Sequence, residues 1–189
     1  MSIRAGILTV LGETEAYGLQ IHGELEARTD RVGRINVGQI YSTLDRLSTA
    51  GLVRASGATD DGLPLYALTD EGRAARADWL TSTSLAAVDA WSEMTFKVLL
   101  ATSLERSGAA ELVQRYRAAW LEESALAGGA APIPDPTARP GLLARRHLAA
   151  AALAWLDDLE AVPGGLDALT HPLRNERPRR GRRPATPEQ

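Results

Sequence analysis

The sequence predicts a mainly α-helical protein with a small β-hairpin, in which an amino-terminal domain precedes a helical arm. Through most of the 189 residues, apolar side chains recur three or four positions apart, which is the spacing of one helix face. One stretch in the first half breaks this spacing, because two short β-compatible segments there flank a run of turn-forming residues. After about residue 85 only the helical spacing remains. These observations place a mixed domain before an entirely helical one.

Two short helices begin the chain. The first has Ile7 and Leu11 on its apolar face, and a glycine follows directly, where such a helix would end. The second has Ile21 and Leu25 on one face. Residues 13–16, between the two helices, are expected to be a plain connection.

A third helix is expected over residues 36–50. Asn36 is a good N-cap, because its side-chain oxygen can accept hydrogen bonds from the free backbone N–H groups of the first turn. Ile40, Leu44 and Leu47 then recur at helical spacing and form one apolar stripe. The other side of this helix is polar, so the helix is predicted to bury one face and expose the other.

The hairpin and a fourth helix complete the first half. Residues 52–55 and 65–68 are the expected strands, and the turn-forming residues 56–64 are the tip between them. Thr69 is the expected N-cap of a helix that runs through Leu80, with acidic residues in its first turn.

Three further helices are expected in the second half, over residues 91–104, 109–126 and 141–161, with a Gly/Pro-rich break at 128–140. The last helix carries two neighbouring apolar stripes. So wide an apolar surface needs two neighbours, one of which could be a second copy of the chain. The second half is therefore predicted to form a homodimer.

The chain thus divides into a domain over residues 1–85, a helical dimerisation and effector domain over 86–171, and a tail over 172–189 that is expected to be disordered. The formal net charge of −3 comes from 21 basic and 24 acidic side chains. Six of the basic side chains, all arginines, and two of the acidic ones, both glutamates, lie in the last sixteen residues. The rest of the chain therefore holds 15 basic and 22 acidic groups. Such an acidic body argues against non-specific coating of nucleic acid but permits local binding. The basic tail is either an arm for extra phosphate contacts or a solubilising extension.

Several classes of protein are not expected. The absence of cysteine excludes a disulfide framework and a cysteine nucleophile, and it fits a cytoplasmic protein. The three histidines stand on separate elements, so no metal site is predicted. No phosphate-binding loop, dinucleotide fingerprint or Ser/His/Asp spacing is present, and neither an enzyme nor a cofactor is predicted. No apolar run approaches the roughly 20 residues needed to cross a bilayer, so no membrane association is expected.

Three helices followed by a hairpin have the order of a winged helix-turn-helix, in which the third helix enters the major groove of DNA. Such a helix must present amides, hydroxyls and guanidinium groups to base edges and phosphates. The residues that supply these groups are Arg34, Asn36, Gln39, Tyr41, Ser42, Thr43 and Arg46. The alternative interpretation is an ordinary solvated helix face.

The sequence resembles the PadR family of transcriptional regulators. The resemblance rests on residues 36–47 (NVGQIYSTLDRL), 51–53 (GLV) and 65–72 (LYALTDEG), and on 17–21 (YGLQI) in the second helix. It covers about residues 3–80 strongly and continues weakly into the last helices. It implies a homodimeric repressor whose winged helices bind the half-sites of an inverted repeat in promoter DNA, with a small molecule releasing some members.

The chain departs from the family pattern at two places. Many members carry proline where this chain has Ser42. Family wings often carry lysine or arginine before the second strand, whereas this tip has Asp60 and Asp61. Because an acidic tip repels phosphate, Arg34, Arg46 and Arg54 are expected to carry more of the contact with the DNA backbone.

The tryptophans have two interpretations. All four lie in helices expected to build the dimer, where large aromatic side chains are usually core or interface anchors. Alternatively, some of them line a pocket for a flat, small hydrophobic effector, for which Trp91 and Trp155 are the first candidates. For the protein as a whole, the alternative to DNA binding is a winged helix that only binds other proteins.

Overall fold

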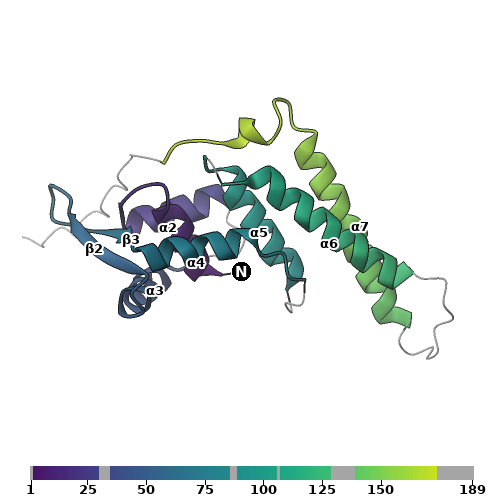
Figure 1. The fold of residues 1–189 in the computed structure, drawn as a ribbon, viewed down its shortest axis with the longest axis horizontal. Helices are drawn as coiled ribbons and strands as arrows, with labels where there is room; N and C mark the ends of the chain where they lie inside the picture. Colours follow the sequence, from purple (N-terminus) through teal and green to yellow (C-terminus); the bar gives the residue numbers. More distant parts are fainter. Residues whose placement is uncertain (1, 30–34, 86–88, 106, 129–138, 174–189) are drawn as a thin grey trace, which may run out of the picture.

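The computed structural model describes residues 2–29, 35–85, 89–105, 107–128 and 139–173. The order of elements is shown in Figure 1 and runs α1 (Ile3–Leu11), β1 (Ala16–Tyr17), α2 (Gly18–Arg28), α3 (Val37–Thr49), β2 (Val53–Ala58), β3 (Pro64–Leu68), α4 (Asp70–Thr81), α5 (Ala90–Thr102), α6 (Ala109–Gly128), α7 (Arg139–Glu160) and a 3₁₀ helix (Leu166–Leu169). The predicted class, mainly helical with a small β-structure, is confirmed.

Side-chain caps begin the helices where the sequence predicts them. Asn36 Oδ1 accepts a hydrogen bond from the backbone N–H of Gly38 at 2.8 Å, at the start of α3. Thr69 Oγ1 accepts one from Gly72 N–H at 3.0 Å, at the start of α4. Both predicted N-caps are therefore confirmed, and they fix where the chain enters each helix.

The β-structure is a three-stranded antiparallel sheet with the order β1-β3-β2. The hairpin is confirmed, and its strands are longer than predicted, so the tip is confined to residues 59–63. A bulge lies between Ala55 and Gly57, where glycine adopts a φ of 127°. The third strand, β1, begins at Ala16, the last residue of the segment expected to be a connection, and Ala16 pairs with Tyr66.

A first hydrophobic core joins α1, α2 and α3 to the sheet, and α5 also belongs to it. Ile7, Leu25 and Leu44 are buried there with Phe96 and Leu100 of α5. The helices approach closely, since a Cβ on Gly6 would lie 2.9 Å from Phe96 Cζ. The winged-helix part therefore depends on a helix that follows residue 85 in the sequence.

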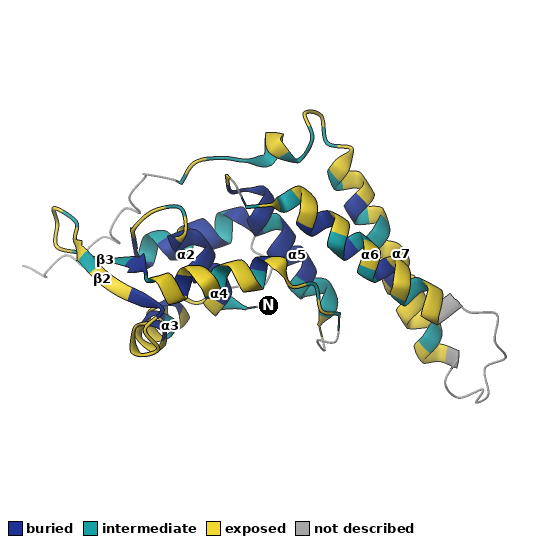
Figure 2. Cartoon of the chain, in the orientation of Figure 1, coloured by how far each residue is buried: buried dark blue, intermediate teal, exposed yellow. Residues whose placement is uncertain are grey.

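A second core lies between the opposite face of α5 and the pair α6–α7. Its buried side chains include Met94 and Val98 of α5, Trp120 of α6, and Ala152 and Leu156 of α7. Figure 1 shows α6 and α7 side by side, projecting away from the winged helix, and Figure 2 shows that much of their outer surface is exposed. We call this pair the arm; the helical domain predicted over residues 86–171 also included α5.

The pair α6–α7 is also joined by polar contacts along its surface. Arg117 forms ion pairs with both Asp157 and Glu160. Near the other end of the pair, Arg145 lies 3.7 Å from Glu123. These contacts link the two helices at both ends without burying charge in the second core.

After α7 the chain returns to the winged helix as a strap, residues 161–173, which appears in yellow-green in Figure 1. His171 N–H donates to Ser103 O at 3.2 Å, and Leu173 packs against the first core. Arg28 of α2 donates from one guanidinium nitrogen to Ser103 O at 2.6 Å and to His171 O at 3.1 Å. The same guanidinium pairs with the buried Glu24 at 2.7 Å. Arg28 thus joins α2, the end of α5 and the strap.

The rest of the predicted tail, residues 174–189, lies outside the described residues. Among the described helices, none combines the length and the apolar character needed to cross a membrane.

Candidate nucleic-acid interface

The third helix buries one side and exposes the other, as the sequence predicts. Ile40, Leu44 and Leu47 are buried in the first core and hold α3 in place. The other side is exposed, as Figure 2 shows, and carries most of the predicted site residues. Of these, Asn36, Gln39, Tyr41, Ser42 and Arg46 are exposed, and Thr43 is half-buried. Arg34 lies outside the described residues.

Two of these residues cap the helix as well as facing solvent. The backbone N–H of Asn36 donates to Gln39 Oε1 at 3.0 Å, while Asn36 Oδ1 accepts from Gly38, so a capping box forms. Each side-chain oxygen therefore uses one of its two lone pairs in the cap, and both amide NH₂ groups remain as donors. In this state Gln39 can donate to a base acceptor, while its oxygen is held at the helix start by the hydrogen bond from Asn36 N–H.

The two flanks of α3 differ in shape. On one flank, the ring of Tyr41 covers the start of α2, because a Cβ on Gly18 would lie 2.6 Å from Tyr41 Cε1. On the other flank, Thr43 and Arg46 line a groove next to α1. The hydroxyl of Ser42, on the exposed face, donates to Gln39 O at 3.2 Å and keeps its oxygen as an acceptor.

The described arginines differ in whether a carboxylate faces them. In α4, α6 and α7 most of the described arginine side chains face a carboxylate, and the pairs are Arg73–Asp70, Arg76–Glu13, Arg115–Glu111, Arg117–Asp157 and Arg145–Glu123. Within the described part of the chain, Arg4, Arg46 and Arg54 have no carboxylate partner, and in the arm the same holds for Arg146. Three cations of the winged helix are therefore available to an external anion.

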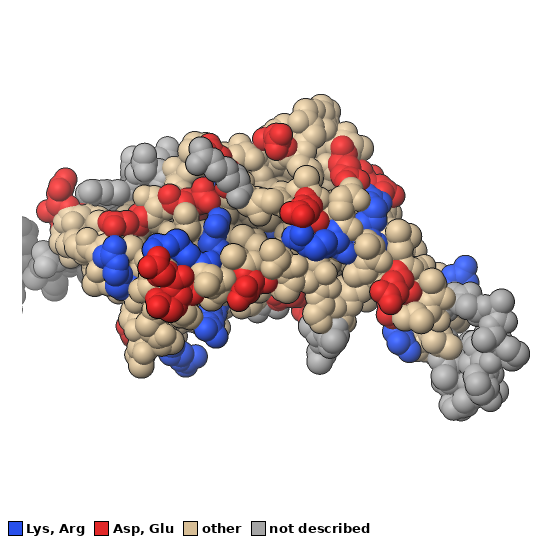
Figure 3. All heavy atoms as spheres, viewed as in Figure 1, with Lys and Arg blue, Asp and Glu red and all other residues tan. Residues whose placement is uncertain are grey.

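The wing offers the opposite charge. Asp60 and Asp61 are exposed at the hairpin tip, where Figure 3 shows acidic groups at the left end of the molecule. Thr59 Oγ1 donates to Asp61 Oδ1 at 2.6 Å and helps to shape the turn. A tip of this charge repels phosphate, so the favourable electrostatics lie on α3 and its neighbours.

The two tryptophans predicted as effector contacts come together in the structure. The rings of Trp91 on α5 and Trp155 on α7 meet edge to face, with centroids 5.8 Å apart. Both are half-buried and pack against the second core. Trp120 is fully buried and donates to Met94 Sδ at 2.9 Å, as a core anchor would. The role of the Trp91–Trp155 pair in effector binding stays a prediction.

Sequence reasoning missed the environment of Lys97, the only lysine of the chain. It is 2% exposed, and its Nζ donates to Ser82 O at 2.6 Å and lies 4.7 Å from the centroid of Trp79. Burial lowers the pKa of Lys97 to about 8, against the opposing effect of Glu93. Lys97 therefore fastens the end of α4 to α5. A lone lysine within an apolar helix was the only signal of this in the sequence.

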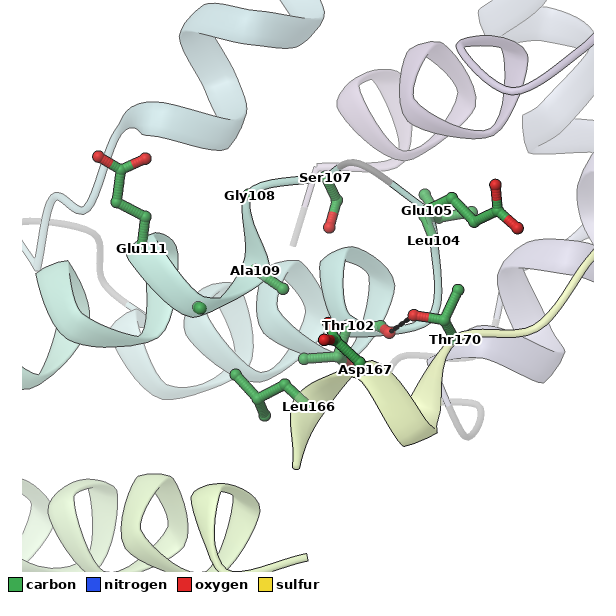
Figure 4. Close-up of a pocket in the computed structure, with 11 residues that line it drawn as sticks. Thr102, Leu104, Glu105, Ser107, Gly108, Ala109, Glu111, Leu166, Asp167 and Thr170 are labelled. Carbon is green, nitrogen blue, oxygen red and sulfur yellow. Dashed lines mark hydrogen bonds between the residues drawn. The ribbon is translucent and has the colours of Figure 1, made fainter. Parts of the chain in front are cut away.

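A cavity of about 570 Å³ lies where α5 ends, α6 begins and the 3₁₀ helix passes. Figure 4 shows its lining, in which Thr170 Oγ1 donates to Thr102 O at 3.3 Å. The acidic side chains of Glu105, Glu111 and Asp167 line it together with small and apolar residues. This lining disfavours phosphate groups. Within the described ranges, no three His, Cys, Asp or Glu side chains are grouped so that they could hold a metal ion.

Among curated proteins, none matches the chain. Similar solved structures include PadR of Bacillus subtilis in complex with operator DNA (19% identity, 82% of this chain and 95% of that chain, TM-score 0.42). They also include the same protein in complex with p-coumaric acid (20% identity, 82% of this chain and 95% of that chain, TM-score 0.40). A further one is the Vibrio cholerae virulence activator AphA (24% identity, 88% of this chain and 96% of that chain, TM-score 0.39).

A family model covers the part of the chain that contains the site. The model of the Transcriptional regulator PadR-like family matches residues 7–78, from α1 into α4. This range includes all of α3 and the whole sheet. Over these residues the chain matches the PadR-like family of transcriptional regulators.

Proposed function

We propose that this protein is a sequence-specific DNA-binding repressor that acts as a homodimer on an inverted-repeat operator. The observation that carries the proposal is the exposed face of α3, where a rigidly held helix presents amides, hydroxyls and the unpaired guanidinium of Arg46. Repression would be steric, because an occupied promoter excludes polymerase. The half-sites are expected about one helical turn apart, roughly 34 Å, or a multiple of that distance.

Within this proposal each predicted residue of α3 and of its N-cap has a role. Arg46 and Thr43 contact phosphate or a base edge, and Ser42 contacts a base from the middle of the exposed face. Tyr41 contacts phosphate or sugar from its own flank. Asn36 and Gln39 donate from their amide groups while they cap the helix.

The arm is proposed to join two copies of the chain. Four large apolar side chains are exposed on it, and these are Leu121 and Leu126 on α6 and Leu143 and Leu148 on α7. These side chains would lose their exposure to water if two copies of the arm packed together. A small hydrophobic effector that separates Trp91 from Trp155 would shift α5 against α7, and through α5 it would change the spacing of the two winged helices.

Arg46→Ala tests the recognition face. We expect it to weaken binding to the promoter next to the protein's own gene about tenfold or more, because one contact to phosphate or guanine is lost in each half-site. The measurement is a footprint with a titration of DNA at moderate salt. Arg146→Ala is the matched control, since Arg146 is also exposed and has no carboxylate partner among the described residues, but lies on the arm.

The outcomes separate the hypotheses. Weakened binding for Arg46→Ala alone supports the proposal. Equal binding of wild type and Arg46→Ala means that another surface contacts the DNA. A wild-type protein that protects no DNA at low salt would favour a winged helix that binds only other proteins.

A further inference from the structure

We propose that Arg4, in the first turn of α1, is a further DNA-binding residue, and that Arg4 and Arg46 together hold one backbone phosphate in a groove beside the recognition helix. This inference rests on the proposed function and deepens it. Among the described residues, those predicted from the sequence lie on α3 or at its N-cap, apart from Arg54 on β2. Arg4 adds a contact from a different helix.

The groove lies between α1 and α3. It has a volume of about 380 Å³ and is lined by Arg4, Thr43, Arg46, Leu47 and Ala50. Thr43 and Arg46 also belong to the exposed recognition face, so the groove continues that face toward α1. Its position is therefore beside the DNA that α3 would contact, on the flank opposite Tyr41.

The position of Arg4 is set by the burial of the rest of its helix. From Ala5 to Leu11 every residue of α1 is buried, whereas Arg4 is exposed. The N-cap Ser2, which accepts from Ala5 N–H at 3.3 Å, fixes the start of the helix. A helix that is otherwise packed into the first core thus holds one guanidinium at the edge of the recognition surface.

The lining suits a phosphate group. Two guanidinium groups and one hydroxyl offer several donors, and arginine binds phosphate oxygens with two parallel N–H groups. No carboxylate lines the groove, and neither arginine has an acidic partner among the described residues. Two like charges that share a groove repel each other, and a bound phosphate would relieve that repulsion.

The two flanks of α3 also match the shape of the target. The major groove is about 12 Å wide and has a phosphate backbone on each side. Tyr41 and the start of α2 lie on one flank of the helix, and the Arg4–Arg46 groove lies on the other. If α3 were inserted between the two DNA backbones, each backbone would therefore face polar side chains of the protein.

The test compares full-length wild type with Arg4→Ala, Arg4→Lys and Arg146→Ala on two DNA fragments, the footprinted promoter and an unrelated sequence. Affinity is measured over a series of salt concentrations. For Arg4→Ala we expect affinity to fall about threefold to tenfold on both fragments, because a phosphate contact carries no sequence information. The negative slope of log K against log salt should become less steep, by up to about 0.9 for each half-site. Arg4→Lys should restore most of the slope, and Arg146→Ala should leave it unchanged.

Thermal unfolding of each variant shows whether the fold is kept. Arg4→Ala is expected to unfold at the same temperature as the wild type. An unchanged slope for Arg4→Ala would overturn the inference and leave the proposed function intact. A loss of affinity on the promoter alone would also overturn it, because it would make Arg4 a base contact. A wild type that binds neither fragment would overturn both.

Discussion

Replacing Arg28 by methionine is expected to lower the free energy of unfolding by about 3–5 kcal/mol, the range found when one partner of a buried ion pair is removed. The guanidinium is buried and faces Glu24 at 2.7 Å, and it donates to backbone oxygens of Ser103 and His171. Methionine has a similar length but no donor. The substitution therefore takes the guanidinium away from a buried carboxylate and from two carbonyl groups.

Chemical denaturation of the two proteins measures this effect. The matched control is Arg73→Met, because Arg73 also pairs with an acidic residue of its own helix, Asp70, but both are exposed. That substitution should change stability little. Hydrogen exchange at His171, whose N–H donates to Ser103 O, should accelerate in Arg28→Met as the strap loosens. If Arg28→Met and Arg73→Met unfold at the same denaturant concentration, the proposed role of Arg28 is wrong.

Replacing Gly72 by alanine is expected to destabilise the protein by about 3 kcal/mol, although alanine normally favours a helix over glycine. A Cβ at this position would lie 2.0 Å from the backbone oxygen of Leu52. A backbone atom cannot rotate away as a side chain does. The first turn of α4 would therefore have to move away from the start of β2, and the Thr69 N–H bond to Leu52 O (3.2 Å) would be strained.

Gly23→Ala is the control for this prediction. Gly23 is an exposed residue of α2, and a Cβ there would meet nothing within 4 Å. This variant should gain about 0.5–1 kcal/mol of stability from helix propensity. Opposite signs for the two glycines, measured by denaturation, are the expected result. A Gly72→Ala protein as stable as the wild type would contradict the close packing of α4 on β2.

Much of the fold could be predicted because its signals are local. The N-caps Asn36 and Thr69 mark the starts of α3 and α4, and the apolar stripe of Ile40, Leu44 and Leu47 marks the buried side of α3. The hairpin is marked by its turn-forming tip. Each of these signals lies within a few residues of the structure that it specifies.

The remaining features depend on contacts between distant parts of the chain. The strand β1 has only two residues, too few for a strand pattern, and it exists through its pairing with β3. Arg28 lies 75 positions before Ser103 and 143 before His171. The helical spacing of α5 is ordinary, yet its two faces enter two different cores, with Phe96 in the first and Met94 in the second. None of these partners can be identified from the spacing of nearby residues.

The candidate site also has one part that local sequence signals predict and another that depends on distant contacts. The exposed face of α3 could be predicted from the periodicity of that helix alone. The capping box changes what Gln39 can offer to DNA, and it depends on a side-chain conformation that the sequence does not specify. Arg4 was missed because it lies in an apolar helix far from α3 in the sequence, and only the packing of α1 against α3 brings it beside Arg46.

The central claim is that the exposed face of α3 and its unpaired arginines bind DNA. The most direct test is the affinity of the wild-type protein for its footprinted promoter over a range of salt concentrations. With Arg4 and Arg46 together holding one phosphate in each of the two half-sites, log K should fall with log salt at a slope of about −1.8 or steeper. An affinity that does not depend on salt would contradict the claim, because contacts with phosphate release counterions.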